Sequence, residues 1–330
     1  MPTVPKILVT GGAGYIGSHT VLALNEAGYE VVVYDNLSTG HAQAVLPPAR
    51  LIPGDVGETD KLDKLLAREQ FTSIIHFAAS IVVPESVSRP LHYYHNNTIK
   101  TTGLIRTAIR HRIRHFLFSS TAAVYGIPEH LPVSENAPLQ PINPYGRSKL
   151  MSEWVLQDVS RACPDFRHVI LRYFNVAGAD PLGRIGQSTP AATHLIKVAC
   201  QTALGQRERL EIFGTDYPTP DGTGIRDYIH VADLARAHVL ALEYLSHDSD
   251  SDIFNCGYGH GYSVQEIVAA VRRISGRPVP TLTVPRRPGD PAELVAAPDK
   301  LQRTVKWRPQ YDDIEKIVES AYRWEQNRSY

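Results

Sequence analysis

A phenol and an ammonium group stand one helical turn apart in the segment NPYGRSK, residues 143–149. Tyr145 precedes Lys149 by four positions, so the two side chains share one face of a helix that begins near Pro144. An unperturbed tyrosine has a pKa near ~10 and is a poor base at neutral pH. A neighbouring ammonium, together with an oxidised nicotinamide, favours the phenolate and lowers that pKa. The pair can then take a proton from an alcohol as hydride leaves for the nicotinamide.

Thr121 supplies a third group for this chemistry. It lies in FSSTAAVYG, where a predicted strand ends, and its hydroxyl can bond the same substrate oxygen as the Tyr145 phenol. Lys149 can also bind the nicotinamide ribose. The alternative is an ordinary pair on a helix surface, because Tyr-x-x-x-Lys alone is a common pattern.

A glycine-rich turn, TGGAGYIGS, lies between the first predicted strand and the first predicted helix. Gly12, Gly14 and Gly17 fit G-x-G-x-x-G, and Gly11 with Gly14 and Gly17 fits the related G-x-x-G-x-x-G. Glycine permits a tight turn, a close approach of a pyrophosphate to the backbone, and close packing of helix on strand. The pattern therefore predicts a dinucleotide site at the positive end of the helix. A purely structural connection is the alternative.

Asp35 ends the second predicted strand, 18 residues after Gly17. An acidic residue there can bind both ribose hydroxyls of an adenosine and would repel the 2′-phosphate of NADP, which favours NAD. Within YDNLSTG the residue could instead be a turn or helix-capping aspartate. The segment GDV, 54–56, is predicted to flank the adenine, and HFAA, 76–79, ends a strand where a dinucleotide crosses the sheet edge.

These groups must be positioned by strands and helices that alternate along the first half of the chain. Continuous apolar runs at 6–10, 31–35 and 73–79 are typical of strands buried on both faces, and helical patterns separate them. The alternation predicts an α/β fold with a doubly wound, Rossmann-like parallel sheet.

Proline and glycine become more frequent after residue 176. Short helices are expected at 190–205, 231–245 and 263–275. We therefore predict an NAD-binding domain at 1–176 and a smaller substrate lobe at 177–330, of which about 226–256 packs back on the first domain.

Composition excludes several classes of function. Lys plus Arg and Asp plus Glu number 34 each, so a nucleic-acid or membrane surface is not expected. Three widely spaced cysteines, no leader pattern and no long apolar run favour a soluble cytoplasmic protein. His111 and His115, or His92 and His95, have helical spacing but lack a third ligand nearby in sequence, so no metal site is predicted.

Motifs over nearly the whole chain resemble the extended short-chain dehydrogenase/reductase family, and within it the UDP-hexose 4-epimerases. The motifs that carry the resemblance are TGGAGYIGSH, YDNLSTG, YYHNN, SSTAAVYG, PYGRSK, LRYFNVAGAD, IFGTDYPTPDGTGIRDYIHVADLA and RRPGDPAELVA. The resemblance implies that NAD takes hydride from carbon 4 of a UDP-hexose and returns it to the opposite face, through a 4-keto sugar. UDP-galactose and UDP-glucose would be interconverted, and similar proteins are often dimers built from two helices each.

The resemblance also implies roles for individual residues. Arg226 and Arg287 are candidate pyrophosphate clamps, since a planar guanidinium suits a diphosphate. The catalytic residues would be Thr121, Tyr145 and Lys149. Those binding the cofactor would be Gly11, Gly12, Gly14, Tyr15, Ile16, Gly17, Asp35, Asn36, Asp55, Val56, Phe77, Ala78, Ala79, Asn96, Ser119, Tyr145, Lys149 and Phe174. Those binding the substrate would be Thr121, Asn175, His194, Leu195, Glu211, Ile212, Phe213, Arg226, Arg287, Asp290 and Leu294.

Two positions depart from the family pattern. Ile81 stands where many members carry a lysine that meets the cofactor phosphates, which removes one charge contact. Leu294 stands where members confined to glucose and galactose often have tyrosine and broader ones a smaller residue. N-acetylhexosamine substrates therefore stay open, as does a plain packing role for Leu294.

Three rival functions share the motifs. A 4,6-dehydratase needs an added acid and base after the threonine, and Ala122 and Ala123 stand there. A 5-epimerase acting on UDP-uronates is less excluded, although DYPTPDGTGIRDYIHV favours the 4-epimerases. A non-catalytic NAD-binding protein has no use for the set Thr121, Tyr145 and Lys149.

Overall fold

The centre of the computed structural model, which describes residues 4–287 and 289–330, is a parallel sheet of seven strands. The strands are β1 (Lys6–Thr10), β2 (Glu30–Asp35), β3 (Arg50–Pro53), β4 (Ser73–His76), β5 (His115–Thr121), β6 (Arg167–Tyr173) and β11 (Asp252–Cys256). They lie in the order β11-β6-β5-β4-β1-β2-β3, which confirms the predicted fold class. Ligands bind such sheets beyond the carboxyl ends of the strands, near where the strand order reverses.

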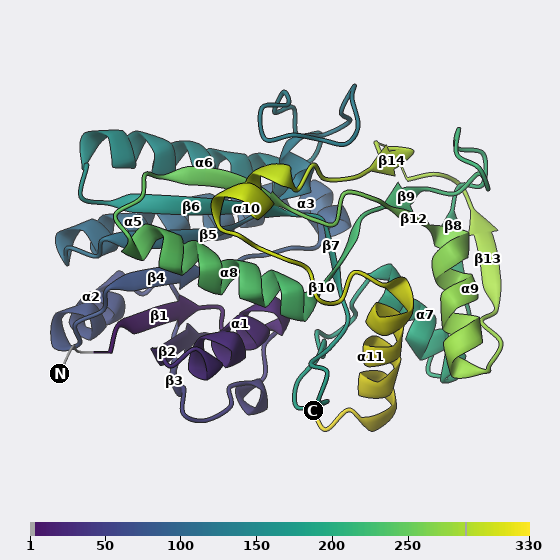
Figure 1. Cartoon of the computed structure of the whole chain (residues 1–330), viewed down its shortest axis with the longest axis horizontal. Helices are drawn as coiled ribbons and strands as arrows, with labels where there is room; N and C mark the ends of the chain where they lie inside the picture. Colours follow the sequence, from purple (N-terminus) through teal and green to yellow (C-terminus); the bar gives the residue numbers. More distant parts are fainter. Residues whose placement is uncertain (1–3, 288) are drawn as a thin grey trace.

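Helices cover both faces of this sheet (Figure 1). One face carries α1 (Tyr15–Glu26) and α8 (Val231–Ser246), which pack against each other. The other face carries α2 (Thr59–Arg68), α5 (Lys100–Arg110) and α6 (Pro144–Ala162). Strand residues such as Ile7 and Leu8 point alternately to these two layers, and both are fully buried, as expected of a strand covered on each side.

Short helical elements follow the carboxyl ends of β2, β4 and β5. They are η1 (Ala42–Ala44), α3 (Val83–Ser88), α4 (Pro90–Tyr93), the π-helix η2 (Tyr94–Ile99) and η3 (Ala122–Val124). A single π turn inside a helical segment is often found at functional sites. Here η2 joins α4 to α5 without a break and contacts α6.

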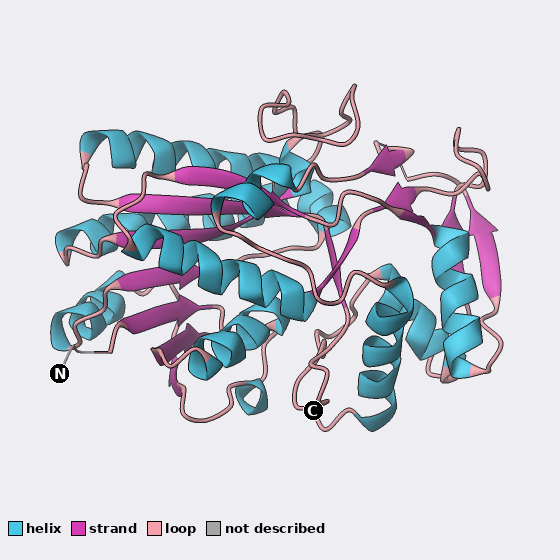
Figure 2. Cartoon of the chain, in the orientation of Figure 1, coloured by secondary structure: helices cyan, strands magenta, loops and turns pink. Residues whose placement is uncertain are grey.

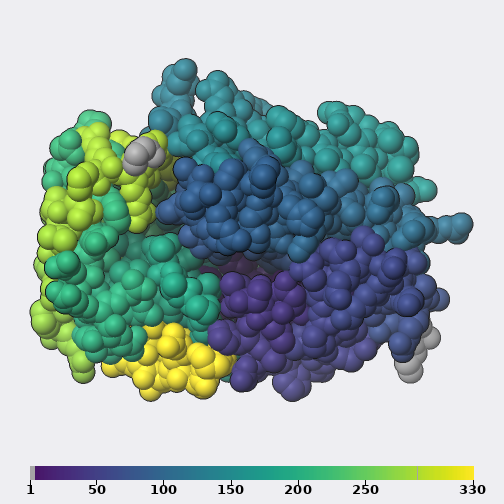
Figure 3. Space-filling model, turned by 180° about the vertical axis from the view of Figure 1, so that it is seen from behind, coloured from purple at the N-terminus to yellow at the C-terminus, as the bar shows by residue number. Residues whose placement is uncertain are grey.

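In the described residues, the second lobe is built from three small sheets and four helices. Most of them are seen on the right of Figure 2, with β7, β10 and α10 nearer the middle. Two of these sheets are pairs, β7 (Asn175–Ala177) with β10 (Tyr228–His230) and β8 (Leu210–Phe213) with β13 (Thr281–Val284). The third has three strands, with β9 (Ile225–Arg226) between β12 (Tyr262–Ser263) and β14 (Glu293–Leu294). The helices are α7 (Leu195–Ala203), α9 (Val264–Ser275), α10 (Asp299–Thr304) and α11 (Ile314–Asn327). Seen from behind, the surface is hollowed where the N-terminal residues meet this lobe (Figure 3).

Two predicted elements have different bounds in the structure. The strand predicted at 73–79 ends at His76, because the backbone N–H groups of Phe77 and Ala78 both donate to the Thr10 carbonyl and the chain turns away. The helix predicted at 190–205 begins only at Leu195. The division into domains at residue 176 stays a prediction, although α8 and β11 lie in the layers of the main sheet.

Parts of two predictions fall outside the described residues: residues 1–3 of the first predicted domain, and Pro288 of the motif RRPGDPAELVA. Among residues 4–287 and 289–330, no helix is both long enough and apolar enough to cross a membrane.

Candidate active site

Helix α6 presents Tyr145 and Lys149 to the carboxyl end of β5. The helix begins at Pro144, and the Asn143 side chain caps it by accepting a hydrogen bond from the Gly146 amide at 2.9 Å. The Lys149 ammonium donates to the Ser119 carbonyl oxygen at 2.8 Å and lies 4.9 Å from the centre of the Phe118 ring. Burial lowers the pKa of Lys149 to about 7, against the charge of Glu153, which raises it.

The phenol of Tyr145 lies within hydrogen-bonding reach of the Thr121 side chain, so the two hydroxyls could bond one substrate oxygen. Burial raises the pKa of Tyr145, and a hydrogen bond with the Thr121 side chain acts to lower it. The sequence led us to expect that Lys149 lowers the pKa of Tyr145. In the protein without its cofactor this pKa is raised, because the effect of burial is the largest and the Lys149 ammonium is directed to the Ser119 carbonyl. The ring of Tyr93 meets that of Tyr145 edge to face, with centroids 6.5 Å apart.

The glycine turn has the geometry that a dinucleotide requires. Gly11 has a φ of 74°, and a Cβ there would lie 2.5 Å from the Ala78 amide nitrogen. A Cβ at Gly17 would lie 2.2 Å from the Gly11 carbonyl oxygen, so glycine lets α1 approach the turn. Gly14 is the N-cap of α1, and no side chain caps that end within the described residues. The amide groups of the first helical turn therefore fit a pyrophosphate.

Asp35 has the turn role that the sequence left open, and its role as a ribose-binding residue stays a prediction. One carboxylate oxygen accepts from the Ala13 amide at 2.9 Å and the other from the Leu37 amide at 2.8 Å. The second bond is the turn contact of an aspartate, and the first ties the end of β2 to the glycine turn. Each carboxylate oxygen can accept a further bond, so the position still fits a ribose.

The other predicted cofactor residues line the same edge of the sheet. Asn36 donates to Asp55 at 2.8 Å, and Asn96 donates to the Ser80 hydroxyl at 3.0 Å. The Tyr15 hydroxyl donates to the Gly178 carbonyl at 2.6 Å. Ser119 and Phe174 are buried at the ends of β5 and β6. Ile16 lies in α1; Val56 follows β3; and Phe77, Ala78 and Ala79 follow β4.

The second lobe brings two groups of predicted substrate residues together. Arg226 forms an ion pair with Asp290, and the pairing of β9 with β14 aligns Arg226 with Leu294. The Arg287 guanidinium lies 3.7 Å from the centre of the Phe213 ring, at the end of β8. On that strand Ile212 is buried and Glu211 is exposed, so the two differ in their access to a ligand.

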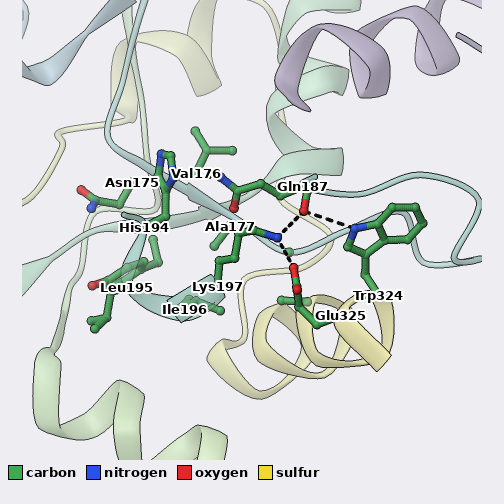
Figure 4. A pocket seen from close by; sticks show the side chains of 13 residues that line it. Asn175, Val176, Ala177, Gln187, His194, Leu195, Ile196, Lys197, Trp324 and Glu325 are labelled. Atoms are coloured by element: carbon green, nitrogen blue, oxygen red, sulfur yellow. Dashed lines mark hydrogen bonds and ion pairs between the residues drawn. The ribbon is translucent and has the colours of Figure 1, made fainter. Parts of the chain in front are cut away.

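Asn175, His194 and Leu195 line a small pocket between β7, α7 and α11 (Figure 4). The imidazole of His194 has a hydrogen-bond partner in this pocket: the side-chain amide nitrogen of Gln187 lies 2.8 Å from its ring nitrogen Nδ1. Part of the His194 surface is exposed, and the protein around its ring partly desolvates the imidazole and so lowers its pKa.

Sequence reasoning missed a buried ion pair in this pocket, between Lys197 and Glu325 (Figure 4). Lys197 also donates to the Gln187 carbonyl at 2.6 Å. The two charged residues are far apart in the chain and have no spacing that could have linked them beforehand.

A second buried ion pair, Arg172 with Glu153, lies behind Lys149 and was also missed. Here a signal existed, because Glu153 follows Lys149 by four residues on α6, as Lys149 follows Tyr145.

Known proteins match this chain over almost its full length. Residues 7–257 match the NAD dependent epimerase/dehydratase family. A UDP-glucose 4-epimerase of Azospirillum brasilense is 54% identical over 323 residues, covering 98% of this chain and 92% of that protein. A UDP-glucose 4-epimerase from Bifidobacterium longum, solved with NAD+ and UDP, has a TM-score of 0.93 at 37% identity, with 98% of each chain covered. The UDP-Glc/GlcNAc 4-epimerase of Campylobacter jejuni has a TM-score of 0.86 at 50% identity, covering 98% of this chain and 99% of that one. These matches confirm the resemblance carried by the motifs, and the chain belongs to the NAD dependent epimerase/dehydratase family.

Proposed function

We propose that this protein inverts carbon 4 of a UDP-hexose, interconverting UDP-galactose and UDP-glucose through a 4-keto sugar. The observation that carries the proposal is the placement of Tyr145 beside Thr121 at the carboxyl end of β5, one helical turn before Lys149. A phenol that shares a substrate oxygen with a threonine hydroxyl can remove the proton of the sugar 4-hydroxyl and return it, whichever face of the sugar ring is presented.

The chain's own groups have the following proposed roles. NAD, when bound, supplies a nicotinamide that accepts a hydride and returns it. The turn Gly11–Gly17 and the first turn of α1 hold its pyrophosphate, and Asp35 holds the adenosine ribose. Lys149 holds the nicotinamide ribose. Because burial raises the pKa of Tyr145, positive charge beside the phenol is needed to make it a base near neutral pH.

The proposal is tested by incubating the purified protein with UDP-galactose or UDP-glucose and separating the products. We expect each sugar to give a mixture of both, without net consumption of NAD. Absence of interconversion in NAD-loaded protein would reject the proposal and favour the non-catalytic alternative. A UDP-glucuronate arm tests the uronate alternative.

A second candidate is epimerisation of N-acetylated UDP-hexosamines, favoured by two observations. Leu294, which pairs with Arg226 across β14 and β9, stands at the position where members confined to glucose and galactose often have tyrosine, and leucine is the smaller side chain. The matched Campylobacter jejuni protein is described as a UDP-Glc/GlcNAc 4-epimerase. The same assay with UDP-N-acetylglucosamine decides whether this chain has the wider range.

Arg287 is proposed to grip the diphosphate. We expect Arg287→Ala to raise KM for the UDP-sugar by about ten- to a hundredfold with a smaller change in kcat, because a charge-assisted hydrogen bond contributes about 1.5–3 kcal/mol. Arg161→Ala is the matched control, because that arginine is exposed and forms an ion pair with Asp158 on its own helix. Equal KM values for Arg287→Ala and the wild type would remove Arg287 from the clamp.

We further propose a homodimer formed through the outer side of α3, α4 and α6. These neighbouring elements expose several large apolar side chains: Val87, Leu91, Met151 and Trp154. A second copy of the chain fits this surface, since a large exposed apolar area marks an interaction site.

Trp154→Glu is expected to raise the Kd of the dimer by about 30-fold or more, because a central aromatic anchor contributes about 2 kcal/mol or more. Sedimentation over a concentration series measures this change. Leu182→Glu is the control, since Leu182 is exposed in a loop of the second lobe. A wild-type protein that sediments as a monomer would refute the dimer.

A cytoplasmic location is proposed from the thiol chemistry. The three cysteines are free in the structure, and burial raises the pKa of Cys200 and Cys256. Unpaired thiols suit a reducing compartment.

A further inference from the structure

A buried carboxylate continues the row of functional side chains along α6. Tyr145, Lys149 and Glu153 follow one another at intervals of four residues, so they lie on one face of the helix. Glu153 is fully buried, with none of its surface exposed to solvent. A carboxylate in such a place is costly unless it is paired and hydrogen-bonded.

Glu153 is bound from both neighbouring strands. Arg172, near the end of β6, donates to it from Nε at 3.0 Å and from Nη2 at 2.6 Å. The Ser120 hydroxyl, near the end of β5, donates to the oxygen Oε1. Ser120 lies between Ser119, which accepts from Lys149, and Thr121, which meets Tyr145. The carboxylate therefore ties α6 to the strand end that positions the other two groups.

The arginine is itself held by a polar network, so the pair is rigid. Its Nη1 donates to the Tyr125 hydroxyl at 3.0 Å and to the Glu135 carbonyl at 3.3 Å. Tyr125 in turn donates to the Asn255 side chain at 2.6 Å. Only 1% of Arg172 is exposed. With its hydrogen-bonding groups satisfied, the network has one arrangement.

We infer that Glu153 is a positioning residue: it docks α6 on the ends of β5 and β6, and its negative charge, one helical turn from Lys149 on the same face, favours the ammonium form of that lysine. The inference deepens the proposed function and rests on it, since it explains how that site retains a cation without solvent.

The charge balance around Lys149 supports this role. Burial alone disfavours the ammonium, and Glu153 is the charged group that raises the pKa of Lys149, which still lies at about 7. Burial, together with the positive charge of Lys149, lowers the pKa of His76, on β4, to about 3. The other titratable or charged groups packed around this part of α6 are Tyr93, Tyr145, Arg172, Tyr173 and, behind Arg172, Glu135. None of these supplies a second anion beside the ammonium, because the Glu135 carboxylate is turned to the Asn255 amide.

A direct test follows the protonation of Lys149 itself. In NAD-loaded protein carrying 13C at the lysine ε-carbons, the Lys149 signal is assigned by its loss in Lys149→Met and followed against pH. We expect Glu153→Gln to move its midpoint down by about one pH unit or more, as for loss of an opposite charge nearby. Lys197, a second buried lysine, pairs with Glu325 and serves as an internal control whose titration stays unchanged.

A second readout is the dependence of kcat on pH. If activity requires the Lys149 ammonium, kcat should fall at a lower pH in Glu153→Gln than in the wild type, so the high-pH limb of the profile moves to lower pH. Glu153→Asp keeps the charge and should keep the limb. Asp233→Asn, which neutralises another buried carboxylate, outside the site, controls for the loss of stability and should leave the limb in place.

The outcomes separate the inference from the proposed function. An unchanged Lys149 midpoint and an unchanged high-pH limb in folded Glu153→Gln would overturn the inference, even if overall activity fell. If wild-type protein does not epimerise, the proposed function fails, and the lysine titration still decides the role of Glu153. Should Glu153→Gln not fold, Glu153→Gln/Arg172→Gln replaces it, and a smaller downward shift of the midpoint is expected because both charges are gone.

Discussion

Tyr145→Phe is expected to lower kcat by about 10²–10⁴-fold, which is the usual contribution of a positioned acid–base group. The ring stays in its place against Tyr93, and only the hydroxyl that meets Thr121 is removed. Binding of UDP and the melting temperature should therefore stay close to those of the wild type. Initial rates at saturating UDP-galactose, together with UDP binding by calorimetry, measure the two effects separately.

The matched control is Tyr244→Phe, a tyrosine of α8 whose ring packs edge to face on Phe254 outside the proposed machinery. It loses the same atom, and we expect unchanged turnover. If Tyr145→Phe retained most of its activity, another group would have to move the hydroxyl proton, and the proposed base would be wrong.

Gly17→Ala should have the largest effect on the fold and on cofactor binding. The added Cβ would lie 2.2 Å from the Gly11 carbonyl oxygen and 2.8 Å from the Gly12 Cα, both backbone atoms that cannot turn aside. The helix α1 must then move away from the turn, at a cost of about 3 kcal/mol or more, at the upper end of overpacking. Because the first turn of α1 is the proposed pyrophosphate site, NAD affinity should fall as well.

Gly103→Ala is the opposite case and the control. Gly103 lies inside α5, where an added Cβ meets only the Thr59 methyl group, at 3.7 Å. Alanine there should stabilise the protein by about 0.5–1 kcal/mol, since glycine is the poorer helix former. Thermal unfolding and NAD titration of both variants give the comparison. Equal NAD affinity in Gly17→Ala and the wild type would contradict the placement of the pyrophosphate.

Local patterns predicted those parts of the site that lie close together in the chain. Tyr145 and Lys149 share a face because the helix period is 3.6 residues, and in the structure Lys149 is buried and Tyr145 is partly buried. The turn after β1 was predictable because its glycines allow a positive φ, as Gly11 has in the structure, which few other residues adopt. The sheet followed from the alternation of apolar runs and helical segments.

The amino-acid sequence by itself therefore determined the fold class, the family and the pair Tyr145 and Lys149. Only the tertiary structure decided what these groups meet: Lys149 is directed to the Ser119 carbonyl, and Arg226 is paired with Asp290, 64 residues away. It also decided the direction in which burial moves each pKa, which for Tyr145 is upward. The physical reason is that periodicity fixes which side chains share a face, whereas desolvation and ion pairing depend on segments that only folding brings together.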